Sequence, residues 1–139
     1  GSKKYLCLAS NIFSQNLKEY EGMQFCIDPN TYEIANIAGK IYKYQNNKTE
    51  CYKKMETIIS EIRSSFNNLT EKPKKTFTHR GVDDGGKSTV TQVSFEFENR
   101  DAIQIQCYNF SVEAGDQNHL RIGINTYDYR YFLSNKAYK

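Results

Sequence analysis

The second half of the chain alternates apolar and polar residues with a period of two. Four runs show this pattern: TFTHR (76–80), STVTQVSFEFEN (88–99), AIQIQCYNFSV (102–112) and HLRIGIN (119–125). Short connections rich in Gly, Asn and Asp separate the runs, which favours antiparallel hairpins. In the second run Val93, Phe95 and Phe97 share one side, while the other side is polar. The pattern predicts a four-stranded meander with one apolar face and one solvated face.

Residues 48–66, before the meander, have the 3.6-residue period of an amphipathic helix. Asn47, followed three residues later by Glu50, resembles a capping box at its start, and Pro73 prevents the helix from continuing into the next segment. We expect this helix to lie on the apolar face of the sheet. Its own apolar side consists of Cys51, Met55, Ile58, Ile59, Ile62 and Phe66.

The remaining segments give weaker signals. Ser10 or Asn11 can cap a short helix that stops before Gly22, and residues 23–27 and 38–45 indicate strands, with extended chain at 31–35. Residues 125–137 fit either a strand or a helix, and the helix is favoured. The expected fold class is therefore α+β: an antiparallel sheet of about four to six strands, one long helix on one face, and short N- and C-terminal helices.

The length of 139 residues fits one domain, spanning residues 3–139, with Gly1 and Ser2 left over from expression. The net charge is +3, and Lys and Arg are interspersed with Asp and Glu. The densest cationic group, Lys72, Lys74 and Lys75, is expected in a solvated connector. This distribution disfavours nucleic-acid binding by a basic stripe. No apolar run approaches the roughly 20 residues that cross a bilayer, so no membrane span is expected.

Four cysteines, Cys7, Cys26, Cys51 and Cys107, are spaced too widely for a zinc or redox motif. An even number of dispersed cysteines indicates two disulfides in an oxidising compartment; the alternative is four reduced cysteines in the core. Cys51 lies on the apolar side of the long helix and Cys107 on a strand of the meander. Pairing Cys51 with Cys107 and Cys7 with Cys26 is therefore favoured over Cys26–Cys51 with Cys7–Cys107.

The disulfide interpretation predicts a secreted or periplasmic location. The first residues, KKYLCLAS, are too short and too interrupted for an intact signal peptide. We therefore expect that a signal peptide has been removed. The order of helix, hairpin, long helix and meander is similar to that of many small exported bacterial domains, a likeness of architecture that carries no functional residue.

Residues 81–88, GVDDGGKS, match the pattern of a phosphate-binding loop. That loop requires a buried strand before it and a helix after it, whereas a β-type run follows Ser88. Asp83 and Asp84 would also place two carboxylates at the phosphates. The segment is better interpreted as a hairpin turn, so no nucleotide and no other cofactor is expected. The spacing of Asp83, Asp84 and Asp101 does not fit a calcium-binding loop.

Two histidines could in principle activate a cysteine nucleophile. His79 and His119 lack a third residue that would orient them, and both are expected at the surface or at a strand edge. Glu96 and Glu98 share the polar side of one strand and are expected to be solvated. No catalytic or metal-binding group is predicted.

Tyrosines are the most informative surface feature. Tyr and Arg are the residue types of binding hot spots, although they equally form the rim of a small core. The function predicted is a non-enzymatic secreted or periplasmic domain that binds a protein or another macromolecule, as an inhibitor, an adaptor or an effector. The alternative is a cytosolic enzyme with a cysteine nucleophile. The candidate recognition surface consists of Tyr42, Tyr44, Tyr127, Tyr129, Arg130 and Tyr131.

Overall fold

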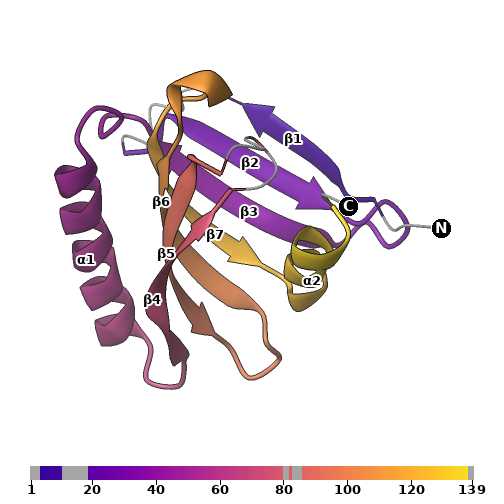
Figure 1. The fold of residues 1–139 in the computed structure, drawn as a ribbon. Helices are drawn as coiled ribbons and strands as arrows, with labels where there is room; N and C mark the ends of the chain where they lie inside the picture. The colour runs from indigo at the N-terminus through magenta and orange to yellow at the C-terminus, as the bar shows by residue number, and fades with distance from the viewer. Residues whose placement is uncertain (1–3, 11–18, 80–81, 83–85, 138–139) are drawn as a thin grey trace.

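A single antiparallel sheet organises the molecule, and the computed structural model describes residues 4–10, 19–79, 82 and 86–137. The seven strands lie in the order β1-β2-β3-β7-β6-β5-β4 (Figure 1). In chain order the elements are β1 (Leu6–Ser10), β2 (Gly22–Ile27), β3 (Ile34–Ile41), α1 (Lys48–Ser65), β4 (Thr70–Thr78), β5 (Thr89–Glu96), β6 (Ala102–Asn109), the 3-10 turn η1 (Val112–Ala114), β7 (His119–Asn125) and α2 (Tyr127–Asn135).

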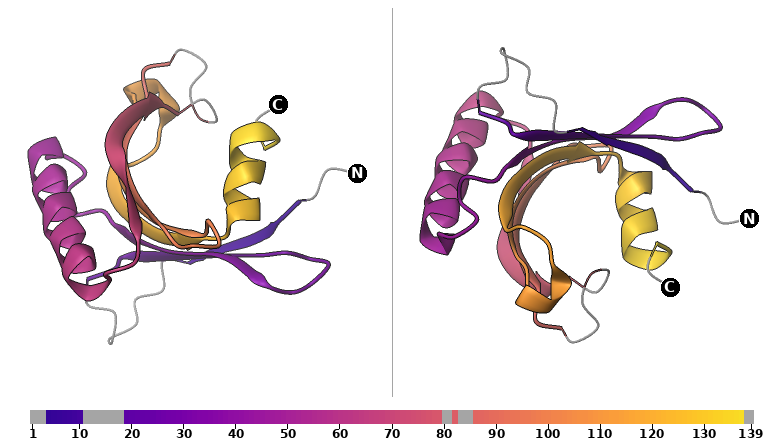
Figure 2. Two further views of the ribbon diagram at one scale, coloured as in Figure 1. Left: turned by 90° about the horizontal axis from the view of Figure 1, so that it is seen from below. Right: turned by 90° about the horizontal axis from the view of Figure 1, so that it is seen from above.

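The sheet curls, so that its two faces differ in shape. Figure 2 shows strands β4 to β7 forming an arc, with α1 on the outer, convex side and α2 on the inner, concave side. α1 packs against β6 and β7, and α2 contacts β3. The two helices therefore cover opposite faces of one sheet, whereas the sequence predicted a sheet covered on one face only.

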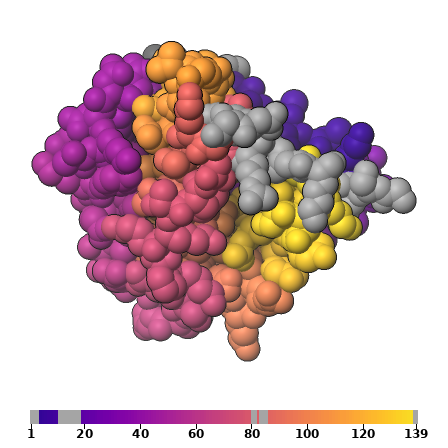
Figure 3. All heavy atoms as spheres, in the orientation of Figure 1, coloured from indigo at the N-terminus to yellow at the C-terminus, as the bar shows by residue number. Residues whose placement is uncertain are grey.

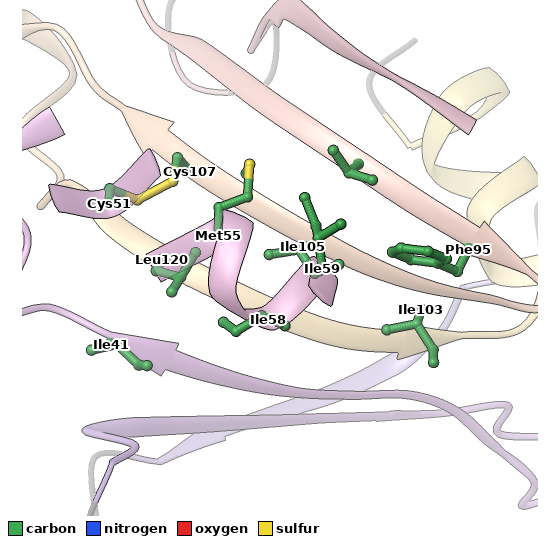
Figure 4. Packing of buried hydrophobic residues seen from close by; sticks show 11 residues of the cluster. Ile41, Cys51, Met55, Ile58, Ile59, Phe95, Ile103, Ile105, Cys107 and Leu120 are labelled. Atoms are coloured by element: carbon green, nitrogen blue, oxygen red, sulfur yellow. A yellow bond between two sulfur atoms is a disulfide. The ribbon is translucent and has the colours of Figure 1, made fainter. Parts of the chain in front are cut away.

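The convex face carries the main hydrophobic core. One side of α1 meets apolar side chains from β3, β5, β6 and β7, and the Cys51–Cys107 disulfide closes one end of this layer (Figure 4). Each fully buried aliphatic side chain contributes about 1.5–3 kcal/mol, so this layer is the principal source of stability. The buried residues of the cluster are Ile41, Cys51, Met55, Ile58, Ile59, Val93, Phe95, Ile103, Ile105, Cys107 and Leu120.

The boundaries of both helices follow from local hydrogen bonds. The side chain of Asn47 accepts a hydrogen bond from the backbone N–H of Glu50, which starts α1 where the capping pattern predicts. Thr126 caps α2 in the same way by accepting from the N–H of Tyr129. The prediction of a C-terminal helix is confirmed.

The predicted number of strands was too low. β1 was missed because its five residues, LCLAS, carry too short a pattern to indicate a strand. β4 was partly missed because Pro73 and three lysines indicated a connector. Pro73 instead lies where the β4–β5 register shifts, on an edge strand whose outer N–H groups need no partner. Lys72, Lys74 and Lys75 thus belong to a strand.

The expected N-terminal helix is not among the described elements. Residues 11–18, on which most of it falls, lie outside the described residues. On either side of them, Ser10 ends β1 and Gly22 begins β2.

Two disulfides join the cysteines in the pairing that the sequence favoured. Cys7 and Cys26 face each other across β1 and β2, and Cys51 and Cys107 link α1 to β6. Both bonds are consistent with an extracellular or periplasmic location. In the described part of the chain, neither helix has the length and apolar character that a membrane crossing demands.

Candidate functional site

The concave face of the sheet is polar where the convex face is apolar. Strand register places residues from six strands in parallel rows, because residues paired across strands lie on the same face. One row contains Lys75, Gln92, Gln106, Arg121 and Lys40, and the next contains Ser94, Gln104, Gly123, Ala38 and Gln24. A third row, on the other side of the first, contains Phe77, Val90, Tyr108 and His119.

Several of these polar side chains are buried and hydrogen-bonded to one another. Gln106 Nε2 donates to Gln92 Oε1 at 2.7 Å, and Gln106 Oε1 accepts from Arg121 Nη1 at 3.1 Å and from the hydroxyl of Tyr108 at 3.2 Å. A second branch runs from Asn125 Nδ2 to Gln104 Oε1 at 2.7 Å. The network holds the side-chain amides in place across three strands and forms a rigid floor.

Two cations lie side by side on this floor. Arg121 and Lys40 are cross-strand partners, and Arg121 is only 8% exposed. Burial lowers the pKa of the Lys40 ammonium, and the positive charge of Arg121 lowers it further, with a smaller opposing effect of Asp116. Among the described residues neither cation has an ion pair. A buried charge without an ion pair is unfavourable, so Arg121, and to a smaller extent the half-buried Lys40, costs the free protein stability.

The absence of a side chain at Gly123 leaves the space that the guanidinium of Arg121 occupies. A Cβ atom at residue 123 would lie 2.9 Å from Arg121 Nη1 and 3.3 Å from Arg121 Cζ. The guanidinium therefore lies across the open backbone of Gly123, next to the small side chain of Ala38. The small residues beside the cations thus make room for the Arg121 guanidinium itself.

His119 lines the same cavity as Lys40 and Arg121 and is uncharged at neutral pH. Burial lowers the pKa of His119 to about 4, and the charges of Lys40 and Arg121 act in the same direction. Its Nδ1 lies 2.9 Å from the carbonyl oxygen of Gln117, so Nδ1 carries the proton and Nε2 is left as an acceptor. The ring stacks on Tyr108, with ring centroids 4.5 Å apart.

The concave face and α2 together enclose a trough with two lobes. The basic lobe, about 500 Å³, is lined by Lys40, Arg121 and His119 from the sheet, by Tyr42 just after β3, and by Tyr129 from α2. The aromatic lobe, about 650 Å³, is lined by Phe77, Val90 and Gln92 from the sheet and by Tyr127 and Tyr131 from α2. The lobes are continuous because both are lined by His79, Gln104, Gln106, Tyr108 and Leu133.

Both walls of the aromatic lobe reach the molecular surface. In Figure 3, side chains of β4 and of α2 border each other on one face of the molecule. Phe77 on β4 and Tyr131 on α2 are 39% and 49% exposed, so the aromatic lobe opens to solvent between them. A volume of several hundred Å³ is typical of ligand-binding pockets.

The structure brings most of the candidate recognition surface to this trough. Tyr42 and Tyr129 line the basic lobe, and Tyr127, Arg130 and Tyr131 line the aromatic lobe. Tyr129 is buried, with its hydroxyl 3.3 Å from Cys26 Sγ. Tyr44 is the exception: β3 ends at Ile41, and after the turn Tyr44 packs against the α1 core.

Sequence reasoning missed the polar floor itself. The polar side of β5 was expected to be solvated, yet Gln92 and Ser94 are buried, and Gln106 and Arg121 are buried beside them. His119 was expected at the surface and is buried as well. The sequence did contain a signal for this floor, because polar residues recur at alternate positions of β5, β6 and β7. Their burial depends on the curvature of the sheet and on α2, which no local pattern specifies.

The other candidate residues have structural roles. Thr89–Glu96, after the GVDDGGKS segment, is a strand, as expected for a hairpin and unlike a phosphate-binding loop. Lys87 pairs with Glu113 at 2.9 Å, and Asp101 Oδ1 accepts from the N–H of Tyr127 at the start of α2. Residues 83–85 lie outside the described residues. Glu96 pairs with Lys72 and Arg130.

The residues that the structure describes include neither a free thiol nor a cluster of metal-binding side chains. Disulfides take up all four cysteines, which leaves no free thiol. No group of three or more His, Cys, Asp and Glu side chains gathers in the described part of the chain. His79 instead lies among rings, with centroids 5.7 Å from Tyr108 and 5.9 Å from Phe110.

A scan against protein-family models, a search of curated proteins and a search of solved structures each found no match to this chain. The chemistry of the trough is therefore the guide to its function.

Proposed function

We propose that this chain is a non-enzymatic binding domain of a secreted or periplasmic protein, and that its trough binds the anionic group of a ligand. The observation that carries the proposal is the pair of Arg121 and Lys40, which share the floor of the basic lobe without an ion pair among the described residues. An anionic group between them would supply the missing counter-charge.

The charge of the whole trough supports the same ligand class. Its described lining contains four cations, Lys40, Lys75, Arg121 and Arg130, and one acidic residue, Asp116. Of the cations, only Arg130 has an ion pair with a described residue, at 3.4 Å from Glu96. The excess positive charge attracts anions and raises their local concentration.

The neutral state of His119 favours binding over catalysis in this trough. An imidazole with a pKa of about 4 is not in the imidazolium form at neutral pH, so it is a poor general acid, and as a base it is weak. It can accept a hydrogen bond from a ligand hydroxyl through Nε2. The alternative function, a cysteine-nucleophile enzyme, requires a thiolate, and the disulfides of the structure favour the binding domain over it.

The trough is compatible with a macromolecular partner. An inhibitor, an adaptor or an effector would have such a partner. The aromatic lobe opens between Phe77 and Tyr131, so a side group or an end of a larger molecule can enter. Determination of the native N-terminus and mass spectrometry without reduction test the proposed compartment. A processed N-terminus and no free thiols are expected; four free thiols in the native protein would contradict a secreted location.

An NMR titration of the ¹⁵N-labelled protein with sodium phosphate, against sodium chloride at equal ionic strength, tests anion binding. We expect saturable shifts in β3, β6 and β7 that are lost in Arg121→Gln. Arg63→Gln is the matched control, because Arg63 pairs with Glu71 on the surface, outside the trough. Equal shifts in wild type and Arg121→Gln, or none in the wild type, would overturn the proposal.

A further inference from the structure

The aromatic lobe and the side-chain amides of the floor indicate which kind of anionic ligand the trough suits. The row that holds Arg121 and Lys40 continues through Gln106 and Gln92 to Lys75 on β4. Three strand spacings separate β7 from β4, which places Arg121 and Lys75 roughly 14 Å apart along the sheet. The trough therefore suits an elongated ligand with an anionic group at the Arg121 end.

The amides between the cations suit a ligand rich in hydroxyl groups. A Gln side chain both donates and accepts hydrogen bonds, as a hydroxyl does. Gln92, Gln104 and Gln106 are fixed by bonds to one another and to Ser94, and each amide retains hydrogen-bonding capacity beyond those bonds. A hydrocarbon tail laid on this floor would leave amide groups unpaired, which disfavours a fatty acid.

The aromatic rings add apolar surface on the walls of the trough. Phe77 lies on one side, Tyr131 on the other, and the Tyr108 ring stands at the junction of the lobes. Flat rings of this kind pack against the C–H faces of sugar rings. Lys75 Nζ lies 5.6 Å from the centroid of the Phe77 ring, so a second cation accompanies the aromatic wall.

We propose that the ligand of the trough is an acidic oligosaccharide, with one carboxylate between Lys40 and Arg121 and its neighbouring sugar rings against Phe77 and Tyr131. This inference rests on the anion-binding function proposed above. It explains why cations, amides and exposed rings follow one another along a single trough. An extended peptide is a poorer fit, because the floor offers side chains and not the unpaired main chain of a strand edge.

Isothermal titration calorimetry with four soluble probes tests the proposal: trigalacturonate, galacturonic acid, neutral maltotriose and adenosine monophosphate. We expect trigalacturonate to bind about tenfold more tightly than each of the others, since only it combines charge with several sugar rings. Saturation-transfer NMR should show contact to its ring protons.

Variants locate the binding site. Phe77→Leu and Tyr131→Leu should weaken trigalacturonate binding several-fold and leave galacturonic acid binding unchanged. Phe66→Leu is the matched control, because Phe66 is 42% exposed, close to the 39% of Phe77, and packs against Phe97 outside the trough. Arg121→Gln should abolish the binding of both acidic sugars.

The outcomes separate this inference from the function on which it rests. If phosphate binds through Arg121 but trigalacturonate binds no better than galacturonic acid, maltotriose or the nucleotide, the oligosaccharide is wrong and anion binding stands. If Phe66→Leu reduces binding as much as Phe77→Leu, the aromatic wall is wrong. If neither phosphate nor any acidic probe binds through Arg121, both proposals fail.

Discussion

The two faces of this sheet are built from the same strands but have different roles. On β6, Ile103, Ile105 and Cys107 point to the convex side and join the core under α1. Between them, Gln104 and Gln106 point to the concave side and line the trough. The convex face gains stability by excluding water from apolar side chains. The concave face holds buried amides and the buried guanidinium of Arg121, which add little net stability and are suited to a ligand.

The difference between the faces predicts very different responses to matched substitutions on β6. Ile105→Ala removes a fully buried side chain from the core and should reduce the free energy of unfolding by about 3–4 kcal/mol. Gln106→Ala, one residue along, should cost about 1–2 kcal/mol, because it leaves the hydrogen-bonding groups of Gln92 and Tyr108 without this partner. Urea unfolding of both variants measures the two values. Equal losses would mean that the concave face is part of the stabilising core.

The pH dependence of stability should report the burial of His119. In the unfolded chain its pKa is near 6.5, whereas burial lowers the pKa of folded His119 to about 4. Between these values only the unfolded state binds the proton, so stability is complete above pH 6.5 and falls as the pH drops towards 4. The loss is roughly 3 kcal/mol for a shift of this size.

Urea unfolding at several pH values between 4 and 7, in wild type and in His119→Phe, measures this loss. Phe retains a ring that can stack on Tyr108 and cannot be protonated, so the variant should show a flatter profile. His79→Phe is the matched control, because His79 also lies near the Tyr108 ring, with ring centroids 5.7 Å apart, and is less buried than His119. An unchanged slope in His119→Phe would contradict the assignment.

The sequence predicted those parts of the fold in which a single helix or strand has a clear hydrophobic period of its own. The long helix, its cap at Asn47 and the meander follow from local periodicity. The Cys51–Cys107 pairing follows too, because each cysteine lies on the apolar side of its own element. β1 and the first part of β4 were missed because a short run and a proline obscure the alternation that identifies strands.

The candidate site could be predicted only in part. Tyr127, Arg130 and Tyr131 were selected for their residue types, and they do line the trough. Arg121 and His119 were missed as a site because their burial depends on the pairing of β7 with β3, which is far from it in the sequence. A polar residue on a strand indicates solvent unless the sheet curls around it, and curvature is a property of the whole sheet.

A smaller effect should follow from removing the repulsion between the two cations. Lys40→Met keeps the length of the side chain and removes its charge, so at pH 7 the variant should be more stable by roughly 0.5–1 kcal/mol, a value limited by the partial exposure of Lys40. Because burial lowers the pKa of folded Lys40, the advantage should shrink as the pH rises through that value towards 10.5. Thermal unfolding of Lys40→Met and of the exposed control Lys43→Met measures it; a less stable Lys40→Met protein would speak against repulsion.

The most direct test of the central claim is the free energy of unfolding of the double variant Lys40→Met/Arg121→Gln, with and without phosphate. If the two cations are held for a ligand, the variant without phosphate should be within about 1 kcal/mol of the wild type or more stable. Phosphate at ten times its dissociation constant should then stabilise only the wild type, by about 1.4 kcal/mol. A variant that loses more than about 2 kcal/mol without phosphate, in a protein that phosphate does not stabilise, would show instead that the cations support the fold.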